Sequence, residues 1–350
     1  MSPKGTWFGA SGVANQATGR ELQPSDRFEI GSITKTFVAT TTLQLVEEDI
    51  LSLEDKLIDQ LPTSVTDWIP NADQITLRQL LNHTSGVPDY TDVLFRWAPV
   101  NPGVFLNRWQ PIELVRFIDG LEASFQAGDS WQYSNTNYLL LGMVVEAATN
   151  NSIAEEIRDR ILDPLALSNT FFAEEEAIPG GYVRGYWDFD QDGTLNDISG
   201  ANLSWAWSTG AMVSNTSDLA TFIHALIGGK LLEPDTLQQM LTTISPITSE
   251  NYSAYGLGIG IMQSPNRFWY IHRGQTLGYR SNMWYSPLEN ITYIELINAR
   301  SSQNLAGATL TTLRRYQSPI SVPEPGMILG VLLTFGTWLT VRPRVRERRG

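Results

Sequence analysis

The stretch Phe28–Phe37, FEIGSITKTF, places a serine three residues before a lysine, at the point where a helix is predicted to begin. The residues ITKTFVATTTLQLVEEDI carry apolar side chains at helical spacing, which predicts a mostly buried helix. Ser32 would receive the free N–H groups and positive dipole end of this helix, and Lys35, one turn on, would share its face. An apolar surround would lower the lysine pKa and let it accept or relay the serine proton. The pair alone leaves open a helix-capping serine beside a solvated lysine.

The rest of the chain has strand-like ends and a helix-rich middle. Residues 5–14 and 27–31 have the pattern of strands, and so do the late segments YGLGIGIM, FWYIHRG, RSNMWYSP and ITYIELINA. Residues from about 50 to 230 contain helical patterns broken by Gly, Pro and Asn loops. This order predicts an α+β fold: one antiparallel sheet built from both chain ends and flanked by helices, with a helical insertion beside it. The cleft between these parts is the expected site.

Composition excludes several kinds of chemistry. The chain has no cysteine, so disulfides, thiol nucleophiles and thiolate zinc sites are ruled out. Its three histidines, His83, His224 and His272, stand far apart, and we expect catalysis without a metal or other cofactor. The formal net charge is -13, and residues 342–350 hold five Arg against one Glu, so the rest of the chain is more acidic still. An acidic body disfavours nucleic acid as a partner, while the basic end suits a membrane surface.

Two further pairs of residues stand at the ends of predicted elements. In WQYSNTNYLLLGMVVE, Tyr133 and Asn135 precede a helix, and in extended backbone their side chains point the same way. A phenol near a lysine can carry protons. In FWYIHRGQTLGYRS, His272 and Gly274 end an apolar strand, where glycine lets a substrate lie close to the backbone. Three of these residues also have a structural explanation. The Tyr133 hydroxyl could be hydrogen-bonded at the edge of the core, Asn135 could cap the next helix, and His272 could simply end a strand.

The order of these motifs carries a family resemblance. Ser-x-x-Lys, then Tyr-x-Asn, then His-x-Gly on a late strand resembles the serine hydrolase family of class C beta-lactamases, penicillin-binding DD-carboxypeptidases and related esterases. The flanking segments LSLEDKL, ITLRQLLNHTSGVPDY, ILDPLALSNT and YGLGIGI are also similar to that family. The similarity runs from about Gly5 to Tyr316 and implies a beta-lactamase/transpeptidase-like domain over residues 1–318.

The resemblance implies the catalytic roles. Ser32 is the expected nucleophile, with Lys35 and Tyr133 as the linked general base that takes its proton and returns it to the leaving group. The oxyanion of the substrate would bind between the backbone N–H groups of Ser32 and Gln275. Water would then cleave the acyl-enzyme.

The resemblance also implies the substrate-binding residues. Asn135 would orient the substrate amide, His272 stands where many members have lysine, and Gly274 allows close approach. A histidine in that place disfavours an efficient beta-lactamase and favours peptidase or esterase activity. Arg273 could grip a substrate carboxylate, but strand alternation points it away from His272.

Three functions compete at this point. The first is a serine hydrolase acting outside the cytoplasm on peptides that end in D-amino acids or on small esters. The second is a beta-lactamase proper, and the third is a binding protein that kept the fold without turnover, which the complete catalytic set disfavours.

Family domains usually begin with a helix and a first strand that this chain lacks, and MSPKGTWFGA has no signal-peptide core. Either the start is truncated or the sheet has lost an edge.

Two other features have structural interpretations. DFDQDGTLND places Asp188, Asp190 and Asp192 as in the first half of a calcium loop, but a serine stands where the bidentate glutamate belongs. We therefore expect a surface turn between strands. His83, in NHTSG, is predicted to lie in a structural turn near the cleft, and His224 to pack in a helix.

Residues 319–350 are predicted to form a separate tail. Val-Pro-Glu-Pro at 322–325 precedes an apolar run at 326–341 and a basic end at 342–350, which fits a membrane span under the positive-inside rule. This order resembles the PEP-CTERM sorting signal of bacterial surface proteins, whose span and basic end are removed after export. It implies a location in the cell envelope or at the surface, at least transient anchoring through 326–341, and a sorting protease as a partner.

Overall fold

A five-stranded antiparallel sheet is the largest sheet of the structure, a computed structural model that describes residues 1–3, 5–245, 247, 249–264 and 267–300. Its strands lie in the order β12-β11-β10-β9-β8, and their bounds are Ala254–Tyr255 (β8), Gly260–Ser264 (β9), Arg267–Gln275 (β10), Arg280–Ser286 (β11) and Ile291–Ile297 (β12). Aromatic and β-branched residues suit these half-buried strands. Three of the four late strands predicted from the sequence are confirmed, and the first, YGLGIGIM, is divided into β8 and β9 by residues 256–259.

Two smaller sheets join distant parts of the chain. One has the order β3-β7-β4 and consists of Phe28–Glu29 (β3), Met212–Ser214 (β7) and Phe171–Phe172 (β4). The other has the order β13-β5-β6 and consists of Ala299–Arg300 (β13), Tyr186–Trp187 (β5) and Asn196–Asp197 (β6). The first of them matters for the site, because β3 leads directly into the segment that carries Ser32.

The N-terminal segment differs from its prediction. Residues 6–12 form no strand, and β1 (Val13–Asn15) pairs with β2 (Arg20–Glu21) in a hairpin that belongs to a second, smaller unit. In the larger unit, Met1 bonds through its backbone to Thr292 of β12. Within the described residues, the large sheet is therefore built from one end of the chain. The glycines at positions 5, 9 and 12 weaken strand formation over the predicted range.

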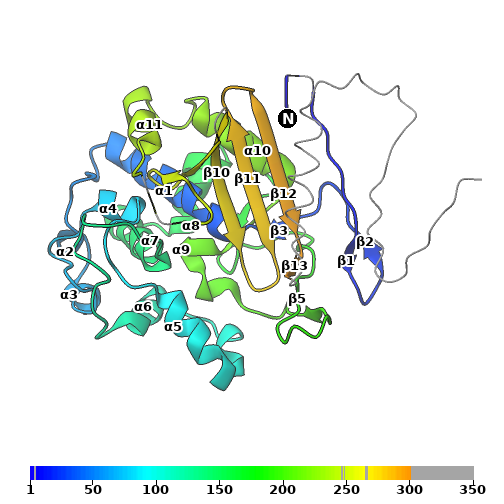
Figure 1. Ribbon diagram of the computed structural model, residues 1–350, viewed down its shortest axis with the longest axis horizontal. Coiled ribbons are helices and arrows are strands. Elements are labelled where there is room, and N and C mark those ends of the chain that lie inside the picture. The colour runs from blue at the N-terminus through cyan, green and yellow to red at the C-terminus, as the bar shows by residue number, and fades with distance from the viewer. Residues whose placement is uncertain (4, 246, 248, 265–266, 301–350) are drawn as a thin grey trace, which may run out of the picture. The chain divides into compact units, whose positions relative to one another are not determined.

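Helices occupy the middle of the chain, as predicted. They are α1 (Thr34–Glu47), α2 (Leu57–Gln60), α3 (Thr63–Thr66), α4 (Leu77–Leu81), α5 (Tyr90–Trp97), α6 (Pro111–Val115), α7 (Asn135–Thr149), α8 (Ile153–Ile157), α9 (Trp207–Gly210), α10 (Thr216–Ile227) and α11 (Pro234–Leu241). Figure 1 shows α2 to α7 grouped to one side of the sheet, and α10 packs against β11 and β12. This arrangement is the predicted α+β fold.

Helix α1 is the buried centre of the larger unit. Residues 34–43 are all buried, and the Thr40 hydroxyl donates to the carbonyl oxygen one turn earlier at 2.8 Å. Phe37 stacks on Phe222 of α10 with 3.7 Å between ring centroids. The predicted burial of this helix is confirmed, and it keeps Lys35, in the first turn, away from water.

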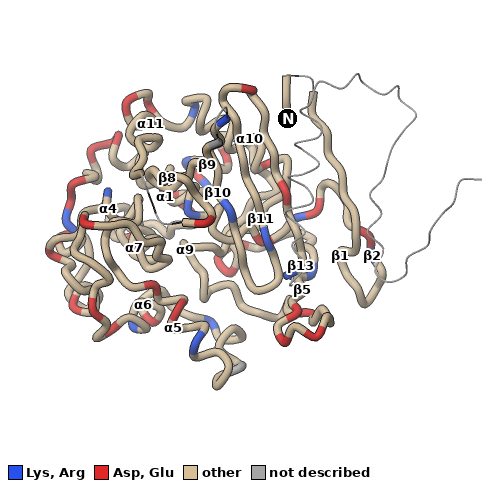
Figure 2. The backbone as a smooth tube through the Cα atoms, in the orientation of Figure 1, with Lys and Arg blue, Asp and Glu red and all other residues tan. Residues whose placement is uncertain are grey.

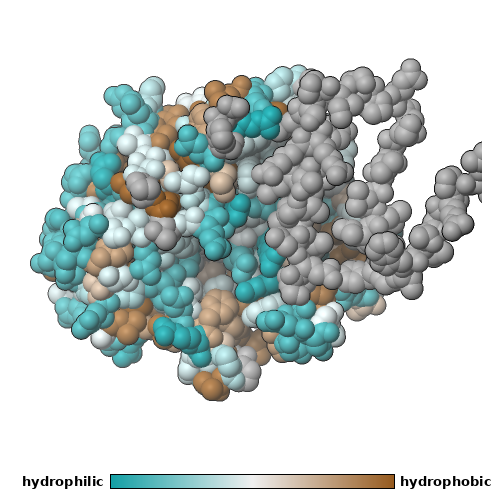
Figure 3. All heavy atoms as spheres, in the orientation of Figure 1, coloured by the Kyte–Doolittle hydropathy of each residue, from teal (hydrophilic) through white to brown (hydrophobic). Residues whose placement is uncertain are grey.

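The surface of the described residues is mixed in character. Figure 2 shows acidic and basic residues distributed along the whole backbone, with several acidic residues together in the loop after β5. Figure 3 shows apolar side chains exposed among hydrophilic ones, and exposed apolar residues of the α5–α6 region include Trp97, Val100 and Leu106. Across the described ranges, the helices are too short or too polar to cross a bilayer. The predicted tail at 319–350 lies outside the described residues.

Candidate active site

Ser32 lies where strand β3 ends and helix α1 begins. It is half-buried in a one-turn 3-10 helix, Gly31–Ile33. Gly31 has a φ of 51°, a left-handed conformation that favours glycine, and a β-carbon there would lie 2.5 Å from the Gln275 nitrogen. This close approach brings the backbone of Gln275 next to the serine.

Lys35 is fully buried one turn after Ser32. Its Nζ lies 3.0 Å from Ser32 Oγ, 2.7 Å from Asn135 Oδ1 and 2.7 Å from the Thr209 carbonyl oxygen. The amide and carbonyl oxygens can only accept hydrogen bonds, so they occupy two N–H groups of the amine. In the neutral amine, the remaining tetrahedral position is the lone pair, which then points at the Ser32 hydroxyl.

The environment of Lys35 favours this neutral form. Burial lowers the pKa of Lys35 to about 7, although the carboxylate of Asp89 opposes the decrease. Its three hydrogen-bond partners are all uncharged. A lysine with such a pKa can accept a proton from serine near neutral pH. The alternative of a solvated lysine beside a capping serine is therefore wrong.

Tyr133 covers another side of the same amine. Lys35 Nζ lies 5.2 Å from the centroid of the Tyr133 ring. Burial and the nearby Tyr252 raise the pKa of Tyr133 well above its usual value, while hydrogen bonding with Ser32 opposes the increase. The phenol therefore stays protonated at neutral pH and can pass a proton on. The predicted common orientation of Tyr133 and Asn135 is confirmed, since both side chains face Lys35.

His272 is connected to Tyr133 through Tyr255. It is fully buried on β10, and its Nδ1 donates to the Arg273 carbonyl oxygen at 2.9 Å, so Nε2 accepts from the Tyr255 hydroxyl at 2.9 Å. Burial lowers the pKa of His272 to about 3, with a further contribution from the positive charge of Lys35. The Tyr255 ring lies 6.3 Å from that of Tyr133. A direct bond from His272 to a substrate would require one of these internal bonds to break.

Gly274 permits a close approach between β10 and the backbone of Ile30. A β-carbon at Gly274 would lie 1.9 Å from the Ile30 carbonyl oxygen, which also accepts from the Ser281 hydroxyl at 2.7 Å. The contact that requires glycine here is therefore with the end of β3, a role that the sequence did not indicate. It serves the site, because Ile30 lies two residues before Ser32.

Asp89 was not identified from the sequence. It precedes α5, and its Oδ2 accepts from the backbone N–H and the Nδ2 of Asn135 at 3.1 and 2.8 Å. An aspartate before a helical pattern, as in PDY, indicates a helix cap. Its contact with a residue 46 positions later is not visible in that pattern.

His83 is also part of the site. It has a φ of 64°, its Nδ1 accepts from the Ser134 N–H at 3.2 Å, and its carbonyl oxygen accepts from the Gln132 N–H at 3.1 Å. Its ring centroid lies 4.2 Å from that of Tyr133. The predicted structural turn is confirmed, and it holds the segment that carries Tyr133. The similarity of NHTSG to the family indicated a structural turn here, but the contacts of His83 with the Tyr133 segment depend on the tertiary structure.

The acidic loop lies between β5 and β6, as the predicted surface turn requires. Oxygens of Asp188, Asp190 and Asp192 lie within 4.8 Å of one another. Asp188 Oδ1 accepts from the Gly193 N–H and Asp192 Oδ1 from the Thr194 N–H, so the turn is stabilised by its own backbone. His224 packs in α10 and bonds to Thr292, as expected of a structural histidine.

The sequence is related to sequences of known proteins. The beta-lactamase family profile matches residues 4–315. Penicillin-binding protein 4* of Bacillus subtilis is 29% identical over 331 residues, which cover 89% of this chain and 70% of the relative. The chain spans about half the length of the Staphylococcus aureus relatives that it matches.

Solved structures share the fold. The D-stereospecific amidohydrolase from Streptomyces sp. has a TM-score of 0.73 and 34% identity, covering 80% of this chain and 84% of that one. The D-amino acid amidase from Ochrobactrum anthropi SV3 has a TM-score of 0.76 and 27% identity, covering 88% and 89%. Because the family profile matches most of the sequence and the fold is shared, this chain belongs to the beta-lactamase/transpeptidase-like family of serine hydrolases.

Proposed function

We propose that this chain hydrolyses its substrates through an acyl-enzyme formed on Ser32. The observation that carries the proposal is the geometry at Lys35. A buried amine with a pKa of about 7 has two of its three partners as pure acceptors, which leaves its lone pair for the Ser32 hydroxyl.

In the acylation step, Ser32 Oγ forms a bond to the substrate carbonyl carbon while its proton passes to Lys35. The bond from that carbon to the leaving nitrogen or oxygen then breaks, and the leaving atom takes up the proton by way of the Tyr133 phenol. Water next adds to the acyl-enzyme, and the same groups accept its proton and return it to Ser32. The negative oxygen formed in each step would be stabilised by the Ser32 and Gln275 N–H groups, each contributing about 3 kcal/mol in other acyl-transfer enzymes.

The proposed substrates are amides and peptides of D-amino acids, together with small esters. Two similar structures are a D-stereospecific amidohydrolase and a D-amino acid amidase. His272, whose pKa burial lowers to about 3, offers no charge to a substrate carboxylate. The Arg273 guanidinium donates to Asn251 and lies over the Trp284 ring. These contacts favour substrates without a carboxylate next to the scissile bond, and they disfavour a beta-lactamase proper.

Intact mass after treatment with a fluorophosphonate tests the nucleophile. We expect one adduct on the wild-type chain, none on Ser32→Ala, and an unchanged adduct on the exposed control Ser52→Ala. An adduct that persists in Ser32→Ala would overturn the assignment.

Turnover of a D-alanine anilide, a small ester, a D-Ala-D-Ala peptide and a cephalosporin tests the substrate class. The anilide and the ester should react fastest, and preference for the cephalosporin would contradict the proposal. An adduct without turnover of any substrate would favour a binding protein.

A further inference from the structure

The carboxylate of Asp89 is completely engaged by neighbouring donors. Its Oδ2 accepts the two bonds from Asn135, and its Oδ1 accepts from the backbone N–H and the hydroxyl of Thr91 at 2.9 and 2.8 Å. Burial raises the pKa of Asp89, while the bonds from Asn135 and Thr91 oppose the increase. A protonated carboxyl would turn a donor toward one of these donors, so the geometry suits the ionised form.

The orientation of the Asn135 amide follows from these bonds. Its Nδ2 has two hydrogens, and both have acceptors, Asp89 Oδ2 at 2.8 Å and Thr91 Oγ1 at 3.0 Å. The Oδ1 atom is left to face Lys35 Nζ at 2.7 Å. A flipped amide would present N–H donors to the lysine, and the Lys35 lone pair would turn toward them instead of Ser32.

We propose that Asp89 is a positioning residue for the reaction: its carboxylate fixes the Asn135 amide, which in turn directs the Lys35 lone pair at Ser32. The inference rests on the proposed function, in which Lys35 serves as the base. It assigns to Asp89 a role beyond capping α5. Because Thr91 and Asn135 donate all four hydrogen bonds at the carboxylate, Asp89 acts on the reaction indirectly, through Asn135.

The charge of Asp89 adds an electrostatic effect. Burial lowers the pKa of Lys35, and the negative carboxylate limits that decrease. The other titratable groups that interact with Lys35 come from β10, from the turn after α4 and from the start of α7, and they are His272, His83, Tyr133 and Tyr138. Burial lowers both histidine pKa values and raises both tyrosine pKa values, so these four groups are neutral around pH 7. Among the described groups facing this lysine, Asp89 therefore supplies the negative charge.

Asp89→Asn separates positioning from capping. Asparagine is an equally good helix N-cap of nearly the same size, but it is uncharged and one of its two polar atoms is a donor. We expect the rate of fluorophosphonate acylation to fall by about 10- to 100-fold, with the melting temperature nearly unchanged. The matched control is Asp92→Asn, which removes the same charge from the exposed first turn of α5 and should leave the rate unchanged.

A second readout does not depend on turnover. The chain has four lysines, Lys4, Lys35, Lys56 and Lys230, so NMR of side-chain-labelled lysine resolves few signals, and Lys35→Arg assigns the one of interest. Because the neutral amine is the active form, activity is lost as pH falls through the Lys35 pKa of about 7. Without the Asp89 charge, both the NMR midpoint and the acid limb of the rate profile should move to lower pH.

The outcomes are distinct. If Asp89→Asn matches Asp92→Asn in acylation rate and in Lys35 midpoint, Asp89 is only a helix cap and the inference is overturned. If the wild-type chain forms no adduct, the proposed function fails. A Lys35 midpoint that still falls in Asp89→Asn would then support the link between these two residues on its own.

Discussion

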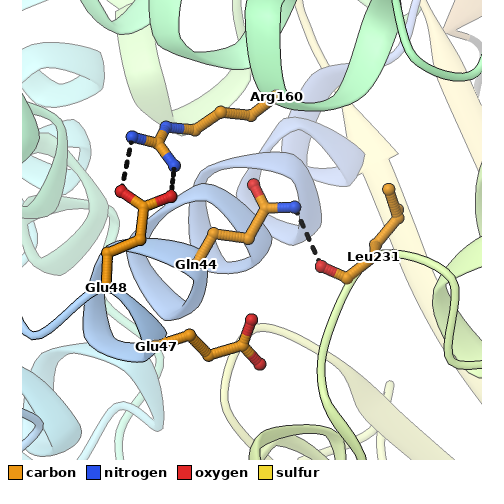
Figure 4. Close-up of a pocket in the computed structure, with 5 residues that line it drawn as sticks. All are labelled: Gln44, Glu47, Glu48, Arg160 and Leu231. Carbon is orange, nitrogen blue, oxygen red and sulfur yellow. Dashed lines mark hydrogen bonds and ion pairs between the residues drawn. The ribbon is translucent and has the colours of Figure 1, made fainter.

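The two ends of helix α1 hold a basic side chain in opposite ways. At its start, Lys35 is fully buried among uncharged oxygens and has a pKa of about 7. At its end, Arg160 donates two bonds to the Glu48 carboxylate, at 2.6 and 3.0 Å. This second pair lines a pocket of about 280 Å³ together with Gln44, Glu47 and Leu231 (Figure 4).

The difference shows how the environments at the two ends of one helix produce a reactive lysine at its start and an ordinary arginine ion pair at its end. The Glu48 side chain is 47% exposed, so water and salt screen its attraction to Arg160. Lys35 has no such screening, and desolvation disfavours its charged form. Burial with neutral partners therefore produces a base near neutral pH, whereas an exposed ion pair produces modest stability.

The strongest test of this comparison is Tyr133→Phe at the reactive end. Phenylalanine keeps the ring that packs on His83 but removes the hydroxyl that carries the proton. We expect turnover to fall by about 100-fold or more, with the fold retained. Steady-state kinetics and circular dichroism check both parts. Unchanged turnover at neutral pH would place the proton carrier elsewhere.

A smaller effect is expected from the buried turn that supports Tyr133. His83→Leu removes the acceptor for the Ser134 N–H, and we expect kcat to fall by about tenfold with little change in KM, since a small displacement of a reacting group is costly. His83→Asn should restore most of the rate, because asparagine offers an acceptor near the Nδ1 position and tolerates the left-handed conformation at φ 64°.

The other end of α1 supplies the control for backbone strain. Asp49 follows Glu48 in the same left-handed region, at φ 57°, and it is exposed. Asp49→Leu should carry a similar conformational cost of about 1–2 kcal/mol without a change in kcat. Equal losses of kcat in the two leucine variants would show that strain, and not the position of Tyr133, controls the rate.

The smallest effect is predicted for Glu48→Gln. Arg160 keeps its bond to Glu156, and the Glu48 side chain of the lost ion pair is 47% exposed, so the free energy of unfolding should fall by no more than about 1 kcal/mol. Urea unfolding at low and high salt measures this change, which should shrink as salt is added. Acylation of Ser32 should proceed at the wild-type rate. A loss of acylation would mean that the two ends of α1 are coupled, against the comparison.

Local contacts were predictable from the sequence. Ser32 and Lys35 are three residues apart on one helical turn, so their proximity follows from helix geometry. The late strands and the buried α1 followed from alternation and helical spacing in the same way. The motif order also indicated the family, and the family resemblance implied that Lys35 and Tyr133 act together.

Tertiary structure alone decided the state of that lysine. Asn135 and Thr209 reach Lys35 from 100 and 174 positions away, and Asp89, His83 and Tyr255 join the site through contacts that no local pattern contains. The prediction that the N-terminal segment joins the large sheet was wrong for a related reason, since strand pairing depends on contacts between segments that are distant in the sequence. A pKa depends on how completely water is excluded and on which atoms replace it. The sequence determined that a lysine follows the serine by one turn, and the packing of distant segments around it decided that it is a base.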